Sequence, residues 1–187
     1  MKKNVFNIFQ SLGLTAEQIK KMTEQIRELQ FAKGETVFSQ GETVKNVYIL
    51  HRGLIKLSYL TAEGKELIKS FISEGDLFGS LVSQLSDGGS TFSAICLEET
   101  DVIVIPYTVF ESVVEQNPTA KKFALTFFKQ LALKKEIREY EFLCLSAEAR
   151  YRKFLDEYPK LFGRIAQQDI ARYLGITPIA LSRIKNR

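Results

Sequence analysis

The spacing of apolar and polar residues divides the chain into a helical start, a β-rich middle and a helical end. At the start, Thr15 and Gln18 have the spacing of a helix capping box. The apolar residues that follow recur at helical intervals: Ile19, Met22, Ile26 and Leu29. We therefore expect residues 1–30 to be helical.

Between Phe31 and Tyr107 the pattern changes to short runs of β-branched and aromatic residues. Glycines in turn-forming contexts separate them, as at Gly41, Gly53 and Gly64. The predicted strands lie within residues 36–38, 47–50, 54–59, 67–72 and 102–105. Strands this short and evenly spaced predict a closed antiparallel barrel or roll.

Helical periodicity returns after Pro118. Residues 120–145 contain no proline or glycine, and the first half of this predicted helix is strongly apolar. A helix that is apolar around so much of its surface must be buried on more than one side. The roll can cover one side, and a second copy of the helix is the simplest cover for the other. Enclosure within a monomer is the alternative. The predicted dimer contacts are Phe123, Phe127, Phe128 and Leu131.

The last part of the chain predicts a helix-turn-helix. Ser146 begins one helix, which stops before Pro159. Further on, Gly175 ends a second helix, Thr177 caps a third, and Pro178 occupies its first position. The residues expected to form the core between the last two helices are Ile170, Ala171, Leu174, Ile176, Leu181 and Ile184.

In a helix-turn-helix the outer face of the second helix enters the major groove of DNA. Arg183 is the best candidate for reading a base, because a guanidinium pairs bidentately with guanine. Phosphate contacts are expected from the other basic residues, Arg164 included. The predicted DNA-binding residues are Gln168, Arg172, Thr177, Pro178, Ile179, Ser182, Arg183, Lys185, Asn186 and Arg187. A helical hairpin used only for packing is the alternative.

The charge distribution supports an anionic partner at this end. Residues 146–187 hold nine Lys/Arg and four Asp/Glu, whereas residues 1–145 hold seventeen and eighteen. The basic excess of the chain, net charge +4, therefore lies entirely in the last part. A solvated basic face would produce the same composition.

Composition argues against several other classes. No window of roughly 18 apolar residues predicts a transmembrane helix, and we expect a cytoplasmic protein. Cys96 and Cys144 are expected to be buried, reduced thiols, too few for an iron–sulfur or zinc site within one chain. His51 is the only histidine and is expected in a solvated turn, so a metal-dependent or Ser-His-Asp enzyme is not expected. No cofactor or metal is predicted.

The order of roll, long helix and helix-turn-helix resembles the Crp/Fnr family of bacterial transcription regulators. The resemblance rests on residues 33–42, 48–56, 75–80, 170–178 and 181–184. It implies a homodimer that binds a pseudo-palindromic site in double-stranded DNA and senses an effector in the roll. RNA polymerase is a further partner that the resemblance implies.

Two departures from the family pattern change the expected ligand and operator. Family members that bind cyclic AMP have a Glu where this chain has Ser80 and an Arg where it has Phe92. Loss of that guanidinium removes the main pairing for a phosphate, so no tight cyclic-nucleotide binding is expected. The pocket is expected to hold another, unknown small-molecule effector or none. The same members have Arg and Glu at the positions of Pro178 and Ile179. The expected effector pocket comprises Phe78, Gly79, Ser80, Leu81, Phe92 and Ser93.

Together these patterns predict an α+β chain with a jelly-roll-like sensor and a C-terminal DNA-binding part. The expected divisions are 1–117 for the roll with its N-terminal helices, 118–145 for the dimerisation helix and 146–187 for the helix-turn-helix. The predicted function is a dimeric, sequence-specific transcription regulator. A ligand-binding or interaction module without DNA binding is the alternative.

Overall fold

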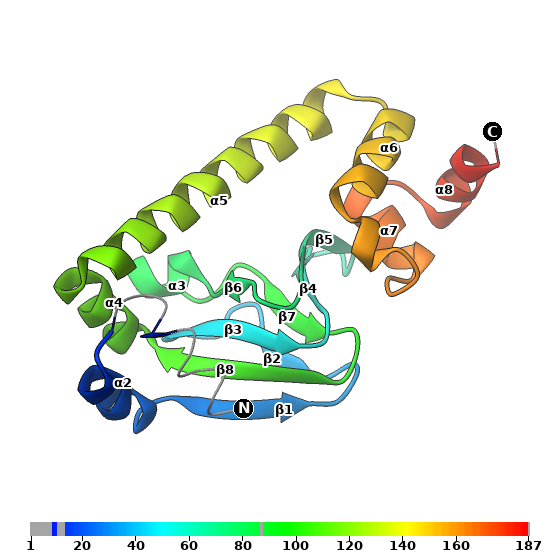
Figure 1. Cartoon of the computed structure of the whole chain (residues 1–187). Helices are drawn as coiled ribbons and strands as arrows, with labels where there is room; N and C mark the ends of the chain where they lie inside the picture. The colour runs from blue at the N-terminus through cyan, green and yellow to red at the C-terminus, as the bar shows by residue number, and fades with distance from the viewer. Residues whose placement is uncertain (1–8, 11–13, 87, 187) are drawn as a thin grey trace.

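The computed structural model describes residues 9–10, 14–86 and 88–186, and its centre is a roll of two four-stranded antiparallel sheets (Figure 1). The first sheet has the order β1 (Arg27–Phe31), β8 (Thr100–Pro106), β3 (Asn46–Arg52), β6 (Leu77–Phe78). The second has the order β2 (Thr36–Phe38), β7 (Ser93–Cys96), β4 (Ile55–Leu60), β5 (Glu66–Ile72). The predicted α+β fold with a β-roll is confirmed.

Helices flank both ends of the roll. They are α2 (Ala16–Thr23), α3 (Leu81–Leu85), α4 (Tyr107–Gln116), α5 (Pro118–Cys144), α6 (Ala147–Glu157), η1 (Pro159–Leu161), α7 (Gln167–Leu174) and α8 (Pro178–Lys185). In the part of the chain that the structure covers, no helix is long and apolar enough to cross a membrane.

The core of the roll is made of inward-facing side chains from both sheets. Phe38, Leu50 and Val102 are almost completely buried there. The ring of Tyr48 stacks on that of Phe78 with 5.1 Å between centroids. Alternate residues along the strands supply this core, as at Val102 and Val104 of β8.

The prediction of helix throughout residues 1–30 is wrong in its last part. Helix α2 ends at Thr23, and residues 27–31 form β1, which pairs with β8. Leu29 lies opposite Val102 in that pairing and is 39% exposed. The backbone of β1 gains a ladder with a strand far away in sequence, and a local apolar spacing cannot reveal such a partner. The Gln18 side chain lies outside the described part of the chain.

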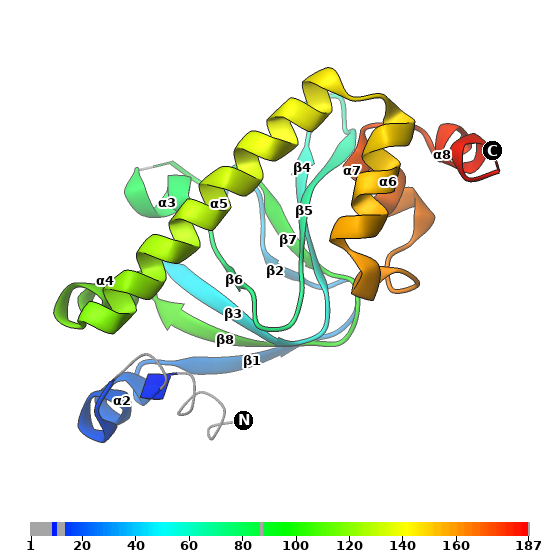
Figure 2. The ribbon, with the colours of Figure 1, turned by 45° about the horizontal axis from the view of Figure 1, so that its top comes forward.

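Helix α5 crosses over the roll and leads away to the C-terminal helices (Figures 1 and 2). Its first amides are capped by the Asn117 side chain, which accepts hydrogen bonds from the backbone N–H of Thr119 and of Ala120. Ala120 and Ala124 are buried, and their small side chains allow the helix to lie close to its neighbours. Cys96 is buried as expected, but Cys144 at the end of α5 is exposed, contrary to the prediction.

The C-terminal helices share a second apolar core with the roll. Phe71 of β5 contacts the rings of Phe154, Tyr158 and Tyr173, at centroid distances of 6.2, 6.1 and 5.5 Å. Leu181 of α8 is completely buried in the same cluster. Helices α6 and α7 therefore lie against the second sheet, as Figure 2 shows, rather than standing clear of it.

Candidate functional site

Helices α7 and α8 are joined by a three-residue turn with the backbone geometry that the sequence predicts. Gly175 has φ of +70°, in the left-handed region that favours glycine. The Thr177 hydroxyl accepts a hydrogen bond from the Ala180 amide at 3.1 Å, and Pro178 occupies the first turn. The predicted helix boundaries on both sides of the turn are confirmed.

One side of α8 packs on α7 and the other faces solvent. Leu181 and Ala171 are fully buried between the helices, and Ile184 is half-buried. Arg183 and Lys185 are exposed and have no ion pair within the described residues. The predicted contact residues that are exposed are Gln168, Thr177, Pro178, Ile179, Ser182, Arg183, Lys185 and Asn186. Arg187 lies outside the described residues.

Arg172 is not free to contact phosphate in this arrangement, which corrects the sequence-based expectation. Its guanidinium forms ion pairs with Glu66 at 2.5 Å and with Asp169 at 3.3 Å. Lys56 of the roll joins the same carboxylates, at 2.7 and 3.2 Å. Burial alone would raise the pKa of Glu66, but Lys56 and Arg172 hold it below its usual value. This network fastens α7 to β4 and β5.

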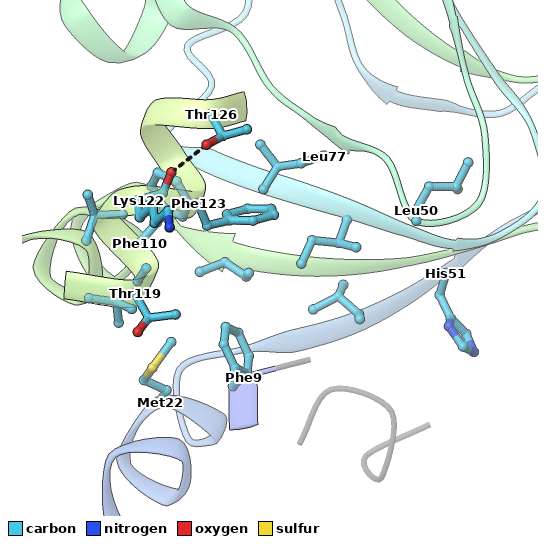
Figure 3. Close-up of a pocket in the computed structure, with 17 residues that line it drawn as sticks. Phe9, Met22, Leu50, His51, Leu77, Phe110, Thr119, Lys122, Phe123 and Thr126 are labelled. Atoms are coloured by element: carbon cyan, nitrogen blue, oxygen red, sulfur yellow. Dashed lines mark hydrogen bonds between the residues drawn. The ribbon is translucent and has the colours of Figure 1, made fainter. Parts of the chain in front are cut away.

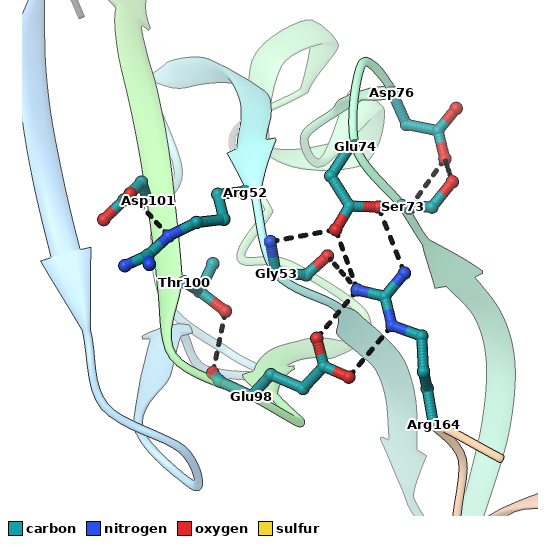
Figure 4. Close-up of polar contacts among 9 residues, drawn as sticks. All are labelled: Arg52, Gly53, Ser73, Glu74, Asp76, Glu98, Thr100, Asp101 and Arg164. Atoms are coloured by element: carbon teal, nitrogen blue, oxygen red, sulfur yellow. Dashed lines mark hydrogen bonds and ion pairs between the residues drawn. The ribbon is translucent and has the colours of Figure 1, made fainter.

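Arg164 is likewise engaged with the roll rather than available to DNA (Figure 4). Its guanidinium donates to both carboxylate oxygens of Glu98, at 2.9 and 2.7 Å, and to both of Glu74, at 3.2 and 2.8 Å. It also donates to the carbonyl of Gly53 at 3.1 Å. These hydrogen bonds lower the pKa of Glu74 to about 2. The sequence offered no indication of this pairing, because its partners lie 66 and 90 positions away.

The end of α5 contacts the same helix pair. Arg138 donates to the Tyr173 carbonyl at 2.6 Å, and Arg150 of α6 donates to the Leu174 carbonyl at 3.0 Å. Cations at the last carbonyls of a helix are favourable. The Phe142 ring lies directly beside Gly175. The position of α8 is thus tied to α5 as well as to the roll.

A cavity of about 450 Å³, the roll cavity, lies between the roll and α5. Four of the six predicted pocket residues line it, namely Phe78, Gly79, Leu81 and Phe92. From α5 it receives Phe127, Phe128, Leu131, Ala132 and Lys135. The volume is within the range of small-molecule sites.

The other two predicted pocket residues do not line the cavity. Ser80 is completely buried, and its hydroxyl caps α3 by accepting from the Ser83 amide at 3.4 Å. The Ser93 hydroxyl accepts a hydrogen bond from the Gln40 amide at 2.9 Å. The sequence analysis instead missed Lys69, whose ammonium group lies 3.6 Å from the centroid of the Phe92 ring.

A second cavity, of about 610 Å³, lies outside the first sheet against α2, α4 and α5 (Figure 3). Its lining is mainly apolar and includes Met22, Ile103 and Phe123. His51 lies at its edge in β3 and is half-buried, so the prediction of a solvated turn histidine is wrong. Within the described residues, no three His, Cys, Asp or Glu side chains come together as a potential metal site.

The predicted dimer residues of α5 do not share one outward face. Phe127, Phe128 and Leu131 line the roll cavity, and Phe123 lines the second cavity. The outward side carries apolar residues that the sequence analysis did not select: Leu125, Leu133, Ile137 and Tyr140, which are 56%, 57%, 45% and 57% exposed. Of the predicted dimer residues, Phe123 and Phe128 are also exposed, at 46% and 39%.

Comparisons with known proteins agree with this architecture. Residues 28–117 match the family described as the cyclic nucleotide-binding domain. FixK2 from Bradyrhizobium japonicum is 20% identical with a TM-score of 0.75, covering 86% of this chain and 83% of its own. The c-di-GMP-responsive global regulator CLP from Xanthomonas campestris is 15% identical with a TM-score of 0.73, covering 92% and 90%.

A third similar structure, from Eubacterium rectale, is assigned to the Crp/Fnr family. It is 16% identical with a TM-score of 0.73, and the match covers 98% of this chain and 86% of that one. No curated protein matches the chain. Residues 28–117 therefore match the cyclic nucleotide-binding domain family, and the chain has the same fold as these solved regulators of the Crp/Fnr type.

Proposed function

We propose that this protein is a dimeric, sequence-specific DNA-binding transcription regulator. The observation that carries the proposal is the solvent-facing side of α8. It presents Ser182, Arg183 and Asn186 without an ion pair among the described residues, on a helix whose opposite side is anchored by Leu181. Polar and guanidinium groups on one face of an exposed helix suit the major groove.

The outward side of α5 supports the dimer. Leu133, Ile137 and Tyr140 recur at intervals of four and three, which places them along one side of the helix. Each is at least 45% exposed in the single chain. A stripe of large apolar side chains is typical of a helix that pairs with a second copy, and a two-fold dimer would present two α8 helices to DNA.

We infer that the roll does not bind cyclic nucleotides tightly. Ser80 replaces the family's Glu and is used as a helix cap, and Phe92 replaces the family's Arg. No arginine is among the described residues that line the roll cavity. The divisions expected from sequence, 1–117, 118–145 and 146–187, follow the ends of α4, α5 and the C-terminal helices and stay part of the proposal.

The test is DNA binding by matched arginine variants. Arg183→Ala is expected to cost roughly 1–3 kcal/mol on the preferred site and to relax selectivity at one base pair in each half-site. Arg152→Ala is the control, because Arg152 is exposed on α6 and pairs with Glu148. Fluorescence anisotropy on specific and mismatched duplexes measures both. Equal effects of the two substitutions would contradict the proposed role of α8.

A further inference from the structure

The roll cavity has an unusual charge content. Among the residues that the structure describes, its lining includes two lysines, Lys69 from β5 and Lys135 from α5, and no aspartate or glutamate. Neither lysine forms an ion pair with any described residue. The rest of the lining is mainly apolar, with aromatic rings from Phe78, Phe92 and Phe127.

Lys69 is half-buried and Lys135 is exposed, and the surroundings of both lysines lower their pKa. Burial lowers the pKa of Lys69 to about 8, with a further contribution from the nearby Lys135. Burial also lowers the pKa of Lys135, together with Arg138 and Lys134. The contact of Lys69 with the Phe92 ring offsets part of this cost. Two mutually repelling cations that lack a counter-ion are stabilised by an anion placed between them and lose stability without one.

The chemistry of the cavity lining indicates what kind of ligand carries the anionic group. Beyond the lysines the polar groups of the lining are few, among them Ser70, Gln84 and Tyr107. Gln84 already donates to the Asn46 carbonyl at 2.8 Å. A ligand rich in hydroxyl groups, such as a sugar, would therefore leave polar atoms unpaired, whereas an aliphatic or aromatic body would be buried among rings and aliphatic side chains.

We propose that the roll cavity binds a small apolar carboxylic acid, with its carboxylate between Lys69 and Lys135 and its body against Phe78, Phe92 and Phe127. Because the two lysines come from the roll and from α5, such a ligand joins these parts. It thereby favours one position of α5, the helix that leads to α8, relative to the roll. This effect on DNA rests on the proposed function, whereas ligand binding itself does not.

The test is calorimetric titration of the full chain with octanoate, octyl phosphate, octan-1-ol and cyclic AMP. Octanoate is expected to bind at least about 10-fold more tightly than octan-1-ol, because only the acid supplies a counter-ion. Lys69→Met and Lys135→Met should each remove about 10-fold of octanoate affinity. Lys65→Met, in the exposed turn before β5, is the control and should leave affinity unchanged.

The unliganded variants provide a second readout. Lys69→Met removes a poorly solvated charge, so its thermal midpoint is expected to equal or exceed that of the parent; a purely structural lysine would give a lower midpoint. Equal binding of octanoate and octan-1-ol, or octanoate binding that ignores both lysines, overturns the proposal. Tighter binding of octyl phosphate or cyclic AMP than of octanoate also overturns it. None of these measurements involves DNA, so their failure is distinguishable from failure of the proposed function.

Discussion

At the scale of single residues, Gly175 occupies a constrained position in the turn between α7 and α8. Its φ of +70° favours glycine, and a Cβ atom there would lie 2.5 Å from Cζ of Phe142. Gly163 is a natural comparison, because its φ is +90° but nothing lies within 4 Å of its Cβ position. Substitutions at these two glycines therefore distinguish the cost of backbone strain from the cost of a steric clash with Phe142.

Gly175→Ala should therefore destabilise the protein more than Gly163→Ala. Backbone strain alone is expected to cost about 1–2 kcal/mol at either site, and displacement of the Phe142 ring adds to it only at Gly175. Urea unfolding of both variants measures the difference. Equal losses would show that the Phe142 contact with the turn contributes nothing.

Residue-level reasoning predicted the turn between α7 and α8 well, because a left-handed glycine, a hydroxyl cap and an N-terminal proline act within a few positions. It failed for Arg164 and Arg172. Their carboxylate partners come from the roll, and local sequence cannot show which basic side chains a distant sheet neutralises.

At the scale of elements, α5 has a double role. Its inner side closes the roll cavity through Phe127 and Leu131, and its outer side carries Leu133 and Tyr140. The apolar composition predicted a helix buried on two sides. The composition could not show which residues lie on which side, because this assignment depends on how the helix is rotated about its axis relative to the roll.

Leu133→Glu should dissociate the proposed dimer. A carboxylate in an apolar interface must be desolvated without a partner, so dimer affinity is expected to fall by at least about 100-fold. Sedimentation velocity at micromolar protein measures this change. Leu85→Glu, on the exposed end of α3, is the control and should stay dimeric. A parent protein that sediments as a monomer would contradict the α5 interface.

At the scale of the whole molecule, ion pairs hold the C-terminal helices on the roll. The ion pairs of Arg164 with Glu74 and Glu98 form one such clamp. The pKa of Glu74 falls from 4.5 to about 2 in the folded protein because of its hydrogen bonds with Arg164. A carboxyl whose pKa is depressed by folding stabilises the fold above its unfolded pKa and loses that contribution as pH falls toward the folded value. The clamp should therefore weaken between pH 4.5 and about 2.

Glu74→Gln should flatten this part of the stability profile. Urea unfolding of the parent and the variant across that acid range measures the effect. Glu115→Gln, an exposed position on α4, should follow the parent. Parallel profiles for the parent and Glu74→Gln would show that the clamp does not contribute to acid sensitivity.

The central claim is that α8 of a dimeric protein reads DNA sequence. The most direct measurement is selection of bound fragments from a random or genomic duplex pool by the purified full chain. The account predicts enrichment of two inverted half-sites whose centres lie about one helical turn apart, roughly 34 Å. Recovery of no common sequence, or of a single half-site without a symmetric partner, would contradict it.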